Sequence, residues 1–143
     1  MNIHNISAEY SASPQIQLNE IPVLAKLGYR SILCNRPDNE DENQPTFESI
    51  KAAAASVNIE AFHLPVIPGN IDADDIRSFK QISHTMTKPT LAYCRTGGGA
   101  EALWTISQAN RLPEHRVPAS NESSFVGDQS APKAKMVIGK MCR

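Results

Sequence analysis

The sequence has few cysteines, and none of them has the spacing of metal ligands. The three cysteines, Cys34, Cys94 and Cys142, are an odd number and lie far apart in the chain. Disulfide-rich secreted scaffolds use several paired cysteines, and structural zinc sites use closely spaced pairs. The sequence therefore argues against both classes, and we expect no metal site and a reducing, cytoplasmic setting.

The sequence also lacks an excess of charge and a long apolar run. Fourteen basic and fifteen acidic residues give a formal net charge of -1, so no overall field attracts nucleic acid or a membrane surface. No segment is long and apolar enough to span a bilayer, and residues 1–6 lack the features of a signal peptide. We expect no nucleic-acid or membrane partner, and any anion site must be local.

The length and composition predict one folded domain followed by a tail. A chain of 143 residues with 41% hydrophobic content can bury one core. After residue 110 the composition changes, with Pro113, Pro118, Pro132 and apolar residues that follow no period. We expect an α/β domain over residues 1–110 and an irregular C-terminal tail over 111–143.

Apolar periodicity predicts alternating strands and helices in the first part of the chain. Strands are expected at residues 3–6, 10–12, 29–34, 59–66 and 90–94. Helices are expected at 17–27, at 46–57 with Thr46 as N-cap, at 72–86 with Asp72 as N-cap, and at 99–110. This order predicts a three-layer α/β fold, in which helices cover both faces of a mainly parallel sheet with an N-terminal edge hairpin.

The segment from Leu91 to Ala100 carries the clearest chemical signal. An apolar strand ends at Cys94, three glycines follow at 97–99, and helical spacing resumes at Ala100. Unpaired N–H groups at a helix N-terminus favour a bound anion and a thiolate. The pattern is typical of a cysteine nucleophile that faces an oxyanion. The alternative is a buried cysteine at a strand end before a glycine-rich turn.

Five segments of the chain resemble the phosphatase-like domain of β-lactamase-hydrolase-like proteins. They are Ser13–Ile16, Leu27–Ile32, Asn35–Asp38, His63–Val66 with Pro68-Gly69, and Leu91–Gly97. They occur in the family's order and with family-like spacing over about three quarters of the chain. The resemblance implies a fold similar to that of dual-specificity protein phosphatases, no cofactor, and a cysteine that attacks phosphorus at the position of Cys94.

The sequence departs from the family where an arginine is expected. Cysteine phosphatases close this loop with an arginine, which members of this family usually carry just after the glycine turn, whereas this chain has Gly98-Gly99-Ala100. A guanidinium offers a planar set of donors that matches phosphoryl oxygens better than amides alone. By analogy with the removal of one transition-state donor, its absence should cost on the order of 10²–10³ in rate or more. Arg95 is adjacent to the cysteine, and we do not assume that it substitutes.

The acid that protonates the leaving oxygen has two candidates. Related phosphatases supply an aspartate from the loop after the strand that is expected to end at Val66, and Asp72 is the nearest one. A role as helix N-cap is the favoured alternative for Asp72. Asp38 is the second candidate, although such loop aspartates often stabilise turns. Arg36 could add positive charge to the site, or could be a solvated loop arginine.

Three functions follow from these residues. The first is a cysteine-dependent phosphatase acting on a small phosphorylated substrate or a phosphoprotein, with Cys94 as nucleophile and Asp72 or Asp38 as acid. Its proposed phosphate-binding residues are Arg95, Thr96, Gly97, Gly98, Gly99 and Arg36. The second is a non-catalytic anion-binding regulatory domain. The third is rhodanese-like sulfur transfer or thiol redox chemistry, in which a Cys34–Cys94 bridge would be the expected sign.

Overall fold

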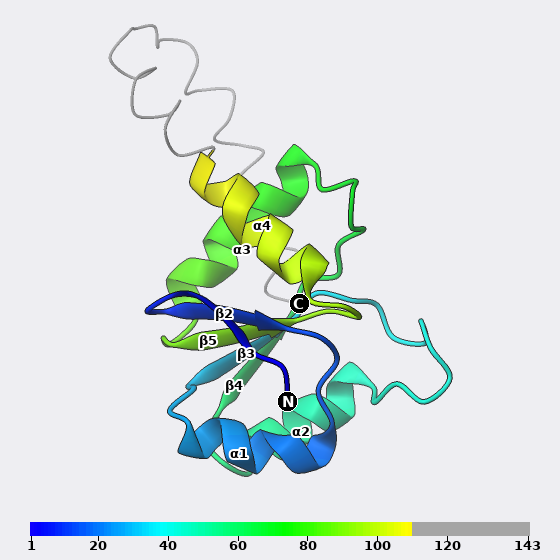
Figure 1. Cartoon of the computed structure of the whole chain (residues 1–143), viewed down its shortest axis with the longest axis vertical. Coiled ribbons are helices and arrows are strands. Elements are labelled where there is room, and N and C mark those ends of the chain that lie inside the picture. The colour runs from blue at the N-terminus through cyan, green and yellow to red at the C-terminus, as the bar shows by residue number, and fades with distance from the viewer. Residues whose placement is uncertain (110–143) are drawn as a thin grey trace, which may run out of the picture.

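The computed structural model describes residues 1–109 and contains one five-stranded sheet (Figure 1). The strand order is β1-β2-β5-β3-β4. The strands are β1 His4–Ser7, β2 Tyr10–Ser13, β3 Ser31–Cys34, β4 Glu60–His63 and β5 Thr90–Tyr93. β1 pairs antiparallel with β2, and the other neighbours pair in parallel. The predicted edge hairpin therefore has only β1 at the edge, because β2 lies inside the sheet.

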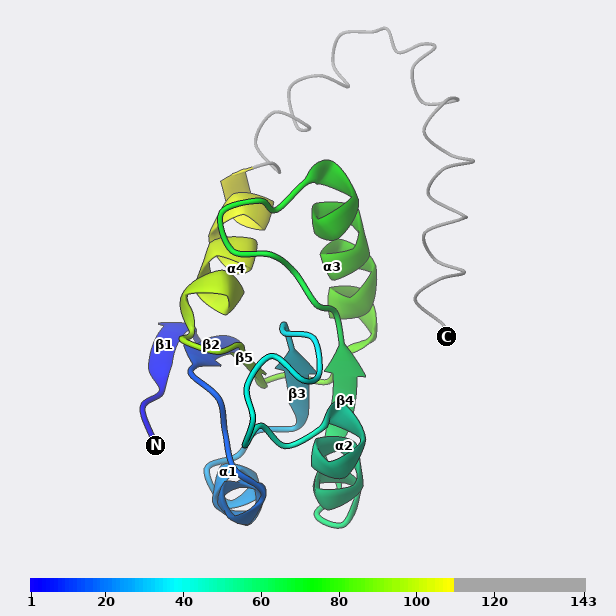
Figure 2. The same cartoon turned by 90° about the vertical axis from the view of Figure 1, so that its right-hand side faces the viewer.

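Helices cover both faces of this sheet (Figures 1 and 2). One face is covered by the short 3-10 helix η1 (Leu18–Glu20), by α1 (Ile21–Lys26) and by α2 (Phe47–Ala55). The other face is covered by α3 (Ala73–Thr85) and α4 (Gly98–Ala109). The predicted three-layer α/β fold is confirmed. The predicted tail lies outside the described residues.

Each face of the sheet has its own apolar core. Ile32 and Leu91 are fully buried toward α1 and α2, whereas the next residues, Leu33 and Ala92, are fully buried toward α3 and α4. Successive strand residues point to opposite faces, and strands buried on both sides need apolar residues at consecutive positions. This explains the continuous apolar runs that predicted β3 and β5. None of the helices in residues 1–109 is long and apolar enough to cross a bilayer.

Most predicted boundaries hold, and the differences have local causes. The helix predicted over 17–27 begins with the 3-10 turn, where Gln17 and Glu20 form a capping box. The strand predicted from residue 29 begins at Ser31, because the Tyr29 N–H donates to Leu24 O and thereby completes the end of α1. The strand predicted over 59–66 is shorter than expected and ends at His63. Thr46 caps α2 as predicted, accepting a hydrogen bond from the Ser49 N–H.

Candidate active site

Parallel pairing brings the carboxyl ends of β2, β5, β3 and β4 to one edge of the sheet. Cys34 at the end of β3 is in register with Tyr93 of β5 on one side and His63 of β4 on the other. The segments after these strands therefore meet at this edge, which is where open α/β sheets bind ligands. Figure 2 shows the loop after β3 between the α1–α2 layer and the segment that leads from β4 to α3.

Cys94 lies at this edge, directly after β5 and ahead of α4. Cys94 is only 3% exposed, and its Sγ accepts a hydrogen bond from the Gly97 N–H at 3.0 Å. Such a donor stabilises negative charge on sulfur. Gly97 has φ +95°, and a Cβ there would lie 3.2 Å from the Ser13 carbonyl carbon, so this position requires glycine. The predicted order of strand, tight loop and helix is confirmed at Cys94.

The segment after β2 holds the cysteine loop in place. The Cys94 N–H donates to Ser13 O at 3.3 Å, and the Gln15 N–H donates to Arg95 O at 3.5 Å. Within the loop, Thr96 Oγ1 accepts a hydrogen bond from the Gly98 N–H at 3.2 Å. These contacts fix the loop between β2 and the start of α4.

Gly99 occupies the position that faces the sulfur. Its φ is not in the left-handed region, so glycine is not required there by the backbone. A Cβ at this position would lie 3.5 Å from Cys94 Sγ and 3.4 Å from Pro68 Cγ, which is ordinary van der Waals contact. A side chain at position 99 would therefore start beside the nucleophile, whereas a Cβ at Gly98 would meet only Thr96 Oγ1, at 3.5 Å.

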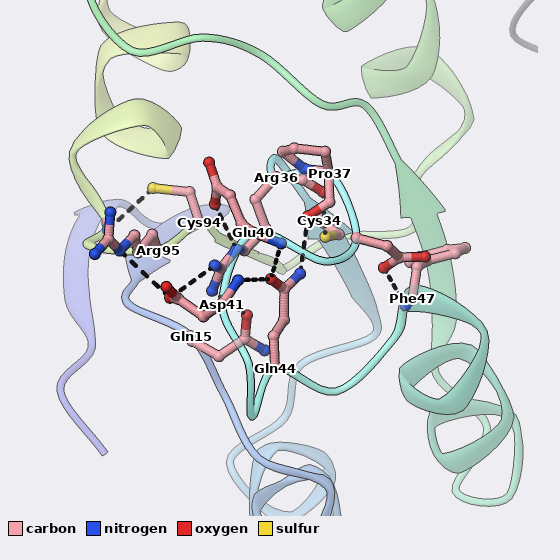
Figure 3. Close-up of polar contacts among 12 residues, drawn as sticks. Gln15, Cys34, Arg36, Pro37, Glu40, Asp41, Gln44, Phe47, Cys94 and Arg95 are labelled. Carbon is pink, nitrogen blue, oxygen red and sulfur yellow. Dashed lines mark hydrogen bonds and ion pairs between the residues drawn. The ribbon is translucent and has the colours of Figure 1, made fainter.

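Arg36 is buried, so the alternative of a solvated loop arginine is wrong. The residue is 2% exposed, and its guanidinium donates to Glu40 Oε1 at 2.8 Å, Gln15 Oε1 at 2.8 Å and Asp41 Oδ2 at 3.0 Å (Figure 3). All three nitrogens are thus engaged within the protein. Arg36 fixes the loop after β3 against the segment after β2, and in this structure its donors are not directed to an anion at Cys94.

Arg95 extends from the cysteine loop to the loop after β3. Its side chain is 65% exposed, and its Nε lies 3.4 Å from Asp41 Oδ2 (Figure 3). The guanidinium is therefore paired with a carboxylate in this structure. Of the other two arginines in residues 1–109, Arg77 pairs with Asp74 on α3, and Arg30 lies before β3 at the opposite end of the strands.

Both aspartates that were predicted as acid candidates have structural hydrogen bonds. Asp72 is the N-cap of α3 and accepts from the Asp75 N–H at 2.9 Å, while Asp75 accepts from the Asp72 N–H. Asp38 Oδ1 accepts from the Phe47 N–H at 2.8 Å at the start of α2. The predicted capping role of Asp72 is confirmed, and the acid role of either residue stays a prediction.

The two described cysteines differ in their surroundings. Both are free, and Cys34 lies with Tyr93 in the core beneath α1 and α2. The Cys34–Cys94 bridge expected for thiol redox chemistry is absent, because Cys34 is in register with Tyr93 and the following residue points to the other face. Burial raises the pKa of the Cys34 thiol, which donates to Arg36 O at 3.4 Å. Cys34 is therefore a protonated core residue.

Several residues of the site were not apparent from the sequence. Three of them are Gln15, Glu40 and Asp41, whose side chains accept hydrogen bonds from Arg36. Only the spacing of four residues between Arg36 and Glu40 indicated such an ion pair in the sequence. The Tyr10 phenol donates to Ala100 O at 3.1 Å, and burial, with a smaller contribution from Cys94, raises its pKa.

Within residues 1–109, no group of three His, Cys, Asp or Glu side chains is placed to hold a metal ion.

The comparisons with known proteins agree with this geometry. A family model described as "Beta-lactamase hydrolase-like protein, phosphatase-like domain" matches residues 2–111. The chain belongs to this family. The resemblance inferred from five sequence segments is thereby confirmed.

The phosphatase-like domain has relatives in longer proteins. It is 33% identical over 108 residues to a β-lactamase hydrolase-like protein of Xylella fastidiosa strain Temecula1, and 29% identical over 109 residues to one of Agrobacterium fabrum. Each match covers 76% of this chain and 25% of the relative. The chain as a whole is thus much shorter than these relatives, and the match covers about a quarter of their length.

Solved structures share the fold of the phosphatase-like domain. A candidate phosphatase from Neisseria meningitidis Z2491 matches with a TM-score of 0.70 and 36% identity, over 76% of this chain and 78% of that one. A candidate phosphatase from Shewanella putrefaciens CN-32 matches with a TM-score of 0.66 and 14% identity, over 97% and 92%. TpbA from Pseudomonas aeruginosa, in complex with phosphotyrosine, matches with a TM-score of 0.51 and 15% identity, over 67% and 54%.

Asp72 variants should test its role as the N-cap of α3. Replacing an N-cap aspartate with alanine costs about 0.5–2 kcal/mol, whereas asparagine caps as well as aspartate. We expect Asp72→Ala to lower the free energy of unfolding by this amount and Asp72→Asn to leave it nearly unchanged, measured by urea denaturation. Equal destabilisation by both variants would contradict the role of the side-chain oxygen as the cap.

The raised pKa of Cys34 predicts a loss of stability in alkali. The folded protein holds the thiol proton of Cys34 more tightly than the unfolded chain does. The protonated thiol therefore contributes to the free energy of unfolding, and this contribution is complete below the ordinary thiol pKa of about 8.5. It is lost as the pH rises through the higher folded pKa. Urea unfolding from pH 7 to 10 should show a smaller loss in Cys34→Ala than in the native protein and in a Cys142→Ala control. Equal losses in all three would refute this role of Cys34.

Proposed function

We propose that this phosphatase-like domain is a cysteine-dependent hydrolase of phosphomonoesters whose rate is reduced because no guanidinium occupies position 99. The observation that supports it is the placement of Cys94 Sγ, 3.0 Å from the Gly97 amide nitrogen and just before the first residues of α4. A thiolate here faces amide donors that suit phosphoryl oxygens. Membership of a phosphatase-like family supports the same reaction.

In the proposed reaction, the Cys94 thiolate attacks phosphorus and the ester P–O bond breaks. The leaving oxygen takes a proton from an acid, for which Asp72 and Asp38 remain the candidates. Water then hydrolyses the phosphocysteine and releases phosphate, which regenerates the thiolate. The amides from Arg95 to Gly99 and the Thr96 hydroxyl would bind the non-bridging oxygens or assist release. The substrate is a small phosphorylated molecule or a phosphoprotein, and no cofactor is required.

The missing guanidinium sets the expected rate. Arg36 is engaged by Glu40, Asp41 and Gln15, and Arg95 is paired with Asp41. Of the arginines in residues 1–109, only Arg95 is exposed and adjacent to the cysteine. Removal of one preorganised transition-state donor costs about 10²–10³ in kcat. We therefore propose weak hydrolysis that an arginine at position 99 would restore.

Sulfur transfer is the second candidate, and one observation favours it. Both candidate acids make capping or loop hydrogen bonds, and the guanidinium of Arg95 is paired with Asp41. Sulfur transfer needs neither group: the Cys94 thiolate attacks the outer sulfur of thiosulfate, the S–S bond breaks, and sulfite leaves with the electron pair. A persulfide then remains on Cys94, facing the same amides.

The decisive experiment compares two arginine variants. Gly99→Arg adds its side chain beside the sulfur, whereas Gly98→Arg adds the same charge one residue away. We expect Gly99→Arg to raise kcat/KM for a small aryl phosphate by about 10²-fold or more. We expect Gly98→Arg to stay near the native rate, and Cys94→Ser to abolish turnover in each background.

The other outcomes identify the alternatives. If no form turns over aryl phosphate but thiosulfate adds one sulfur atom to Cys94 by mass spectrometry, the sulfur-transfer function replaces the proposal. If phosphate binds and neither reaction occurs, the domain is a non-catalytic anion-binding module. Turnover that survives in Cys94→Ser would refute a role for this cysteine.

A further inference from the structure

Asp41 occupies an unusual position, because one of its oxygens contacts two arginines from different loops. Asp41 Oδ2 accepts a hydrogen bond from Arg36 Nη2 at 3.0 Å and lies 3.4 Å from Arg95 Nε. Figure 3 shows Asp41 between the buried Arg36 and the exposed Arg95 beside Cys94. The carboxylate therefore joins the loop after β3 to the cysteine loop.

The two contacts differ in strength. Arg36 is 2% exposed and is also fixed by Glu40 and Gln15, each at 2.8 Å. The pair with Arg95 is longer than a normal charge-assisted hydrogen bond, and its side chains are 65% and 45% exposed. Exposed ion pairs contribute little to stability. The contact between Asp41 and Arg95 can thus open while Arg36 remains in place.

The position of Asp41 is fixed independently of Arg95. Gln44 Oε1 accepts hydrogen bonds from the N–H groups of Glu40 and Asp41, at 3.0 and 3.2 Å, and Gln44 Nε2 donates to Pro37 O at 2.9 Å. The main chain of the loop therefore holds the carboxylate where it is. When the pair opens, Arg95 is the partner that moves.

We propose that Asp41 competes with an anion bound at the Cys94 loop for the guanidinium of Arg95. This inference rests on the proposed function, since it assumes that the loop binds a phosphoryl or similar oxyanion. An incoming anion offers the same kind of acceptor as the carboxylate, and Arg95 transfers from one to the other. Asp41 is a positioning residue, and its effect is to lower the affinity of the site for anions.

The test compares two variants that each remove one negative charge from the same loop. Asp41→Asn keeps an oxygen that can accept a hydrogen bond from Arg36, but it removes the charge that pairs with Arg95. Glu42→Gln removes the neighbouring exposed charge and serves as the control, because the ion pair of Arg95 is with Asp41. The dissociation constant of inorganic phosphate is measured by calorimetry at physiological salt, where distant charges are screened.

We expect the dissociation constant of phosphate to be two- to five-fold lower in Asp41→Asn than in the native protein. This is about the change in an equilibrium constant that the loss of one exposed ion pair produces. Glu42→Gln should match the native protein. In an Arg95→Gln background, Asp41→Asn should have no further effect. Phosphate should also shift the NMR signal of the Arg95 Nε–Hε group in the native protein, which needs no substitution.

Equal phosphate affinity in Asp41→Asn and Glu42→Gln, with an unshifted Arg95 signal, would overturn the competition and leave the anion site intact. A tightening that persists in the Arg95→Gln background would also overturn it, because the effect would then act through Arg36 or the general field. Absence of phosphate binding in every form would overturn both this inference and the proposed function.

Discussion

The buried guanidinium of Arg36 joins the loops that surround Cys94. It bonds to Gln15 after β2 and to Glu40 and Asp41 after β3, and Asp41 in turn contacts Arg95 after β5. A buried charge is stable only when carboxylates and hydrogen bonds compensate it. This requirement holds the three loops in one arrangement. It also means that Arg36 stabilises the scaffold, because all three of its guanidinium nitrogens are engaged by Gln15, Glu40 and Asp41.

The rest of the site follows from the end of the parallel sheet. Asn35, next to Arg36, joins the end of β3 to both neighbouring strands. Its N–H donates to Tyr93 O at 2.8 Å, and its Nδ2 donates to Leu64 O at 2.9 Å. Asp38 bonds to the first residue of α2, and the Pro37 carbonyl accepts from Gln44 Nε2, so each position of the Asn35–Asp38 segment has a structural contact. The segments shared with the family thus position the strand ends, and the nucleophile depends on them for its geometry.

The local features of the fold and site could be predicted from the sequence, whereas the long-range ones could not. Cys94 before a glycine turn, Thr46 and Asp72 as N-caps, and the strand and helix order all depend on neighbouring residues. The burial of Arg36 depends on Gln15, 21 residues away, and on β5 lying between β2 and β3. The sequence showed that no arginine follows the glycine turn, but only the backbone geometry shows that position 99 faces the sulfur.

We propose Cys94 as a phosphorus-attacking nucleophile whose loop lacks only a guanidinium at position 99. Its most direct test is peptide mass spectrometry of the native and Gly99→Arg proteins, quenched during incubation with an aryl phosphate. We expect a phosphoryl group on Cys94 and none on Cys34, with faster accumulation in Gly99→Arg. A Cys94 that remains free of phosphoryl in both proteins, or a phosphoryl group on another residue, would contradict it.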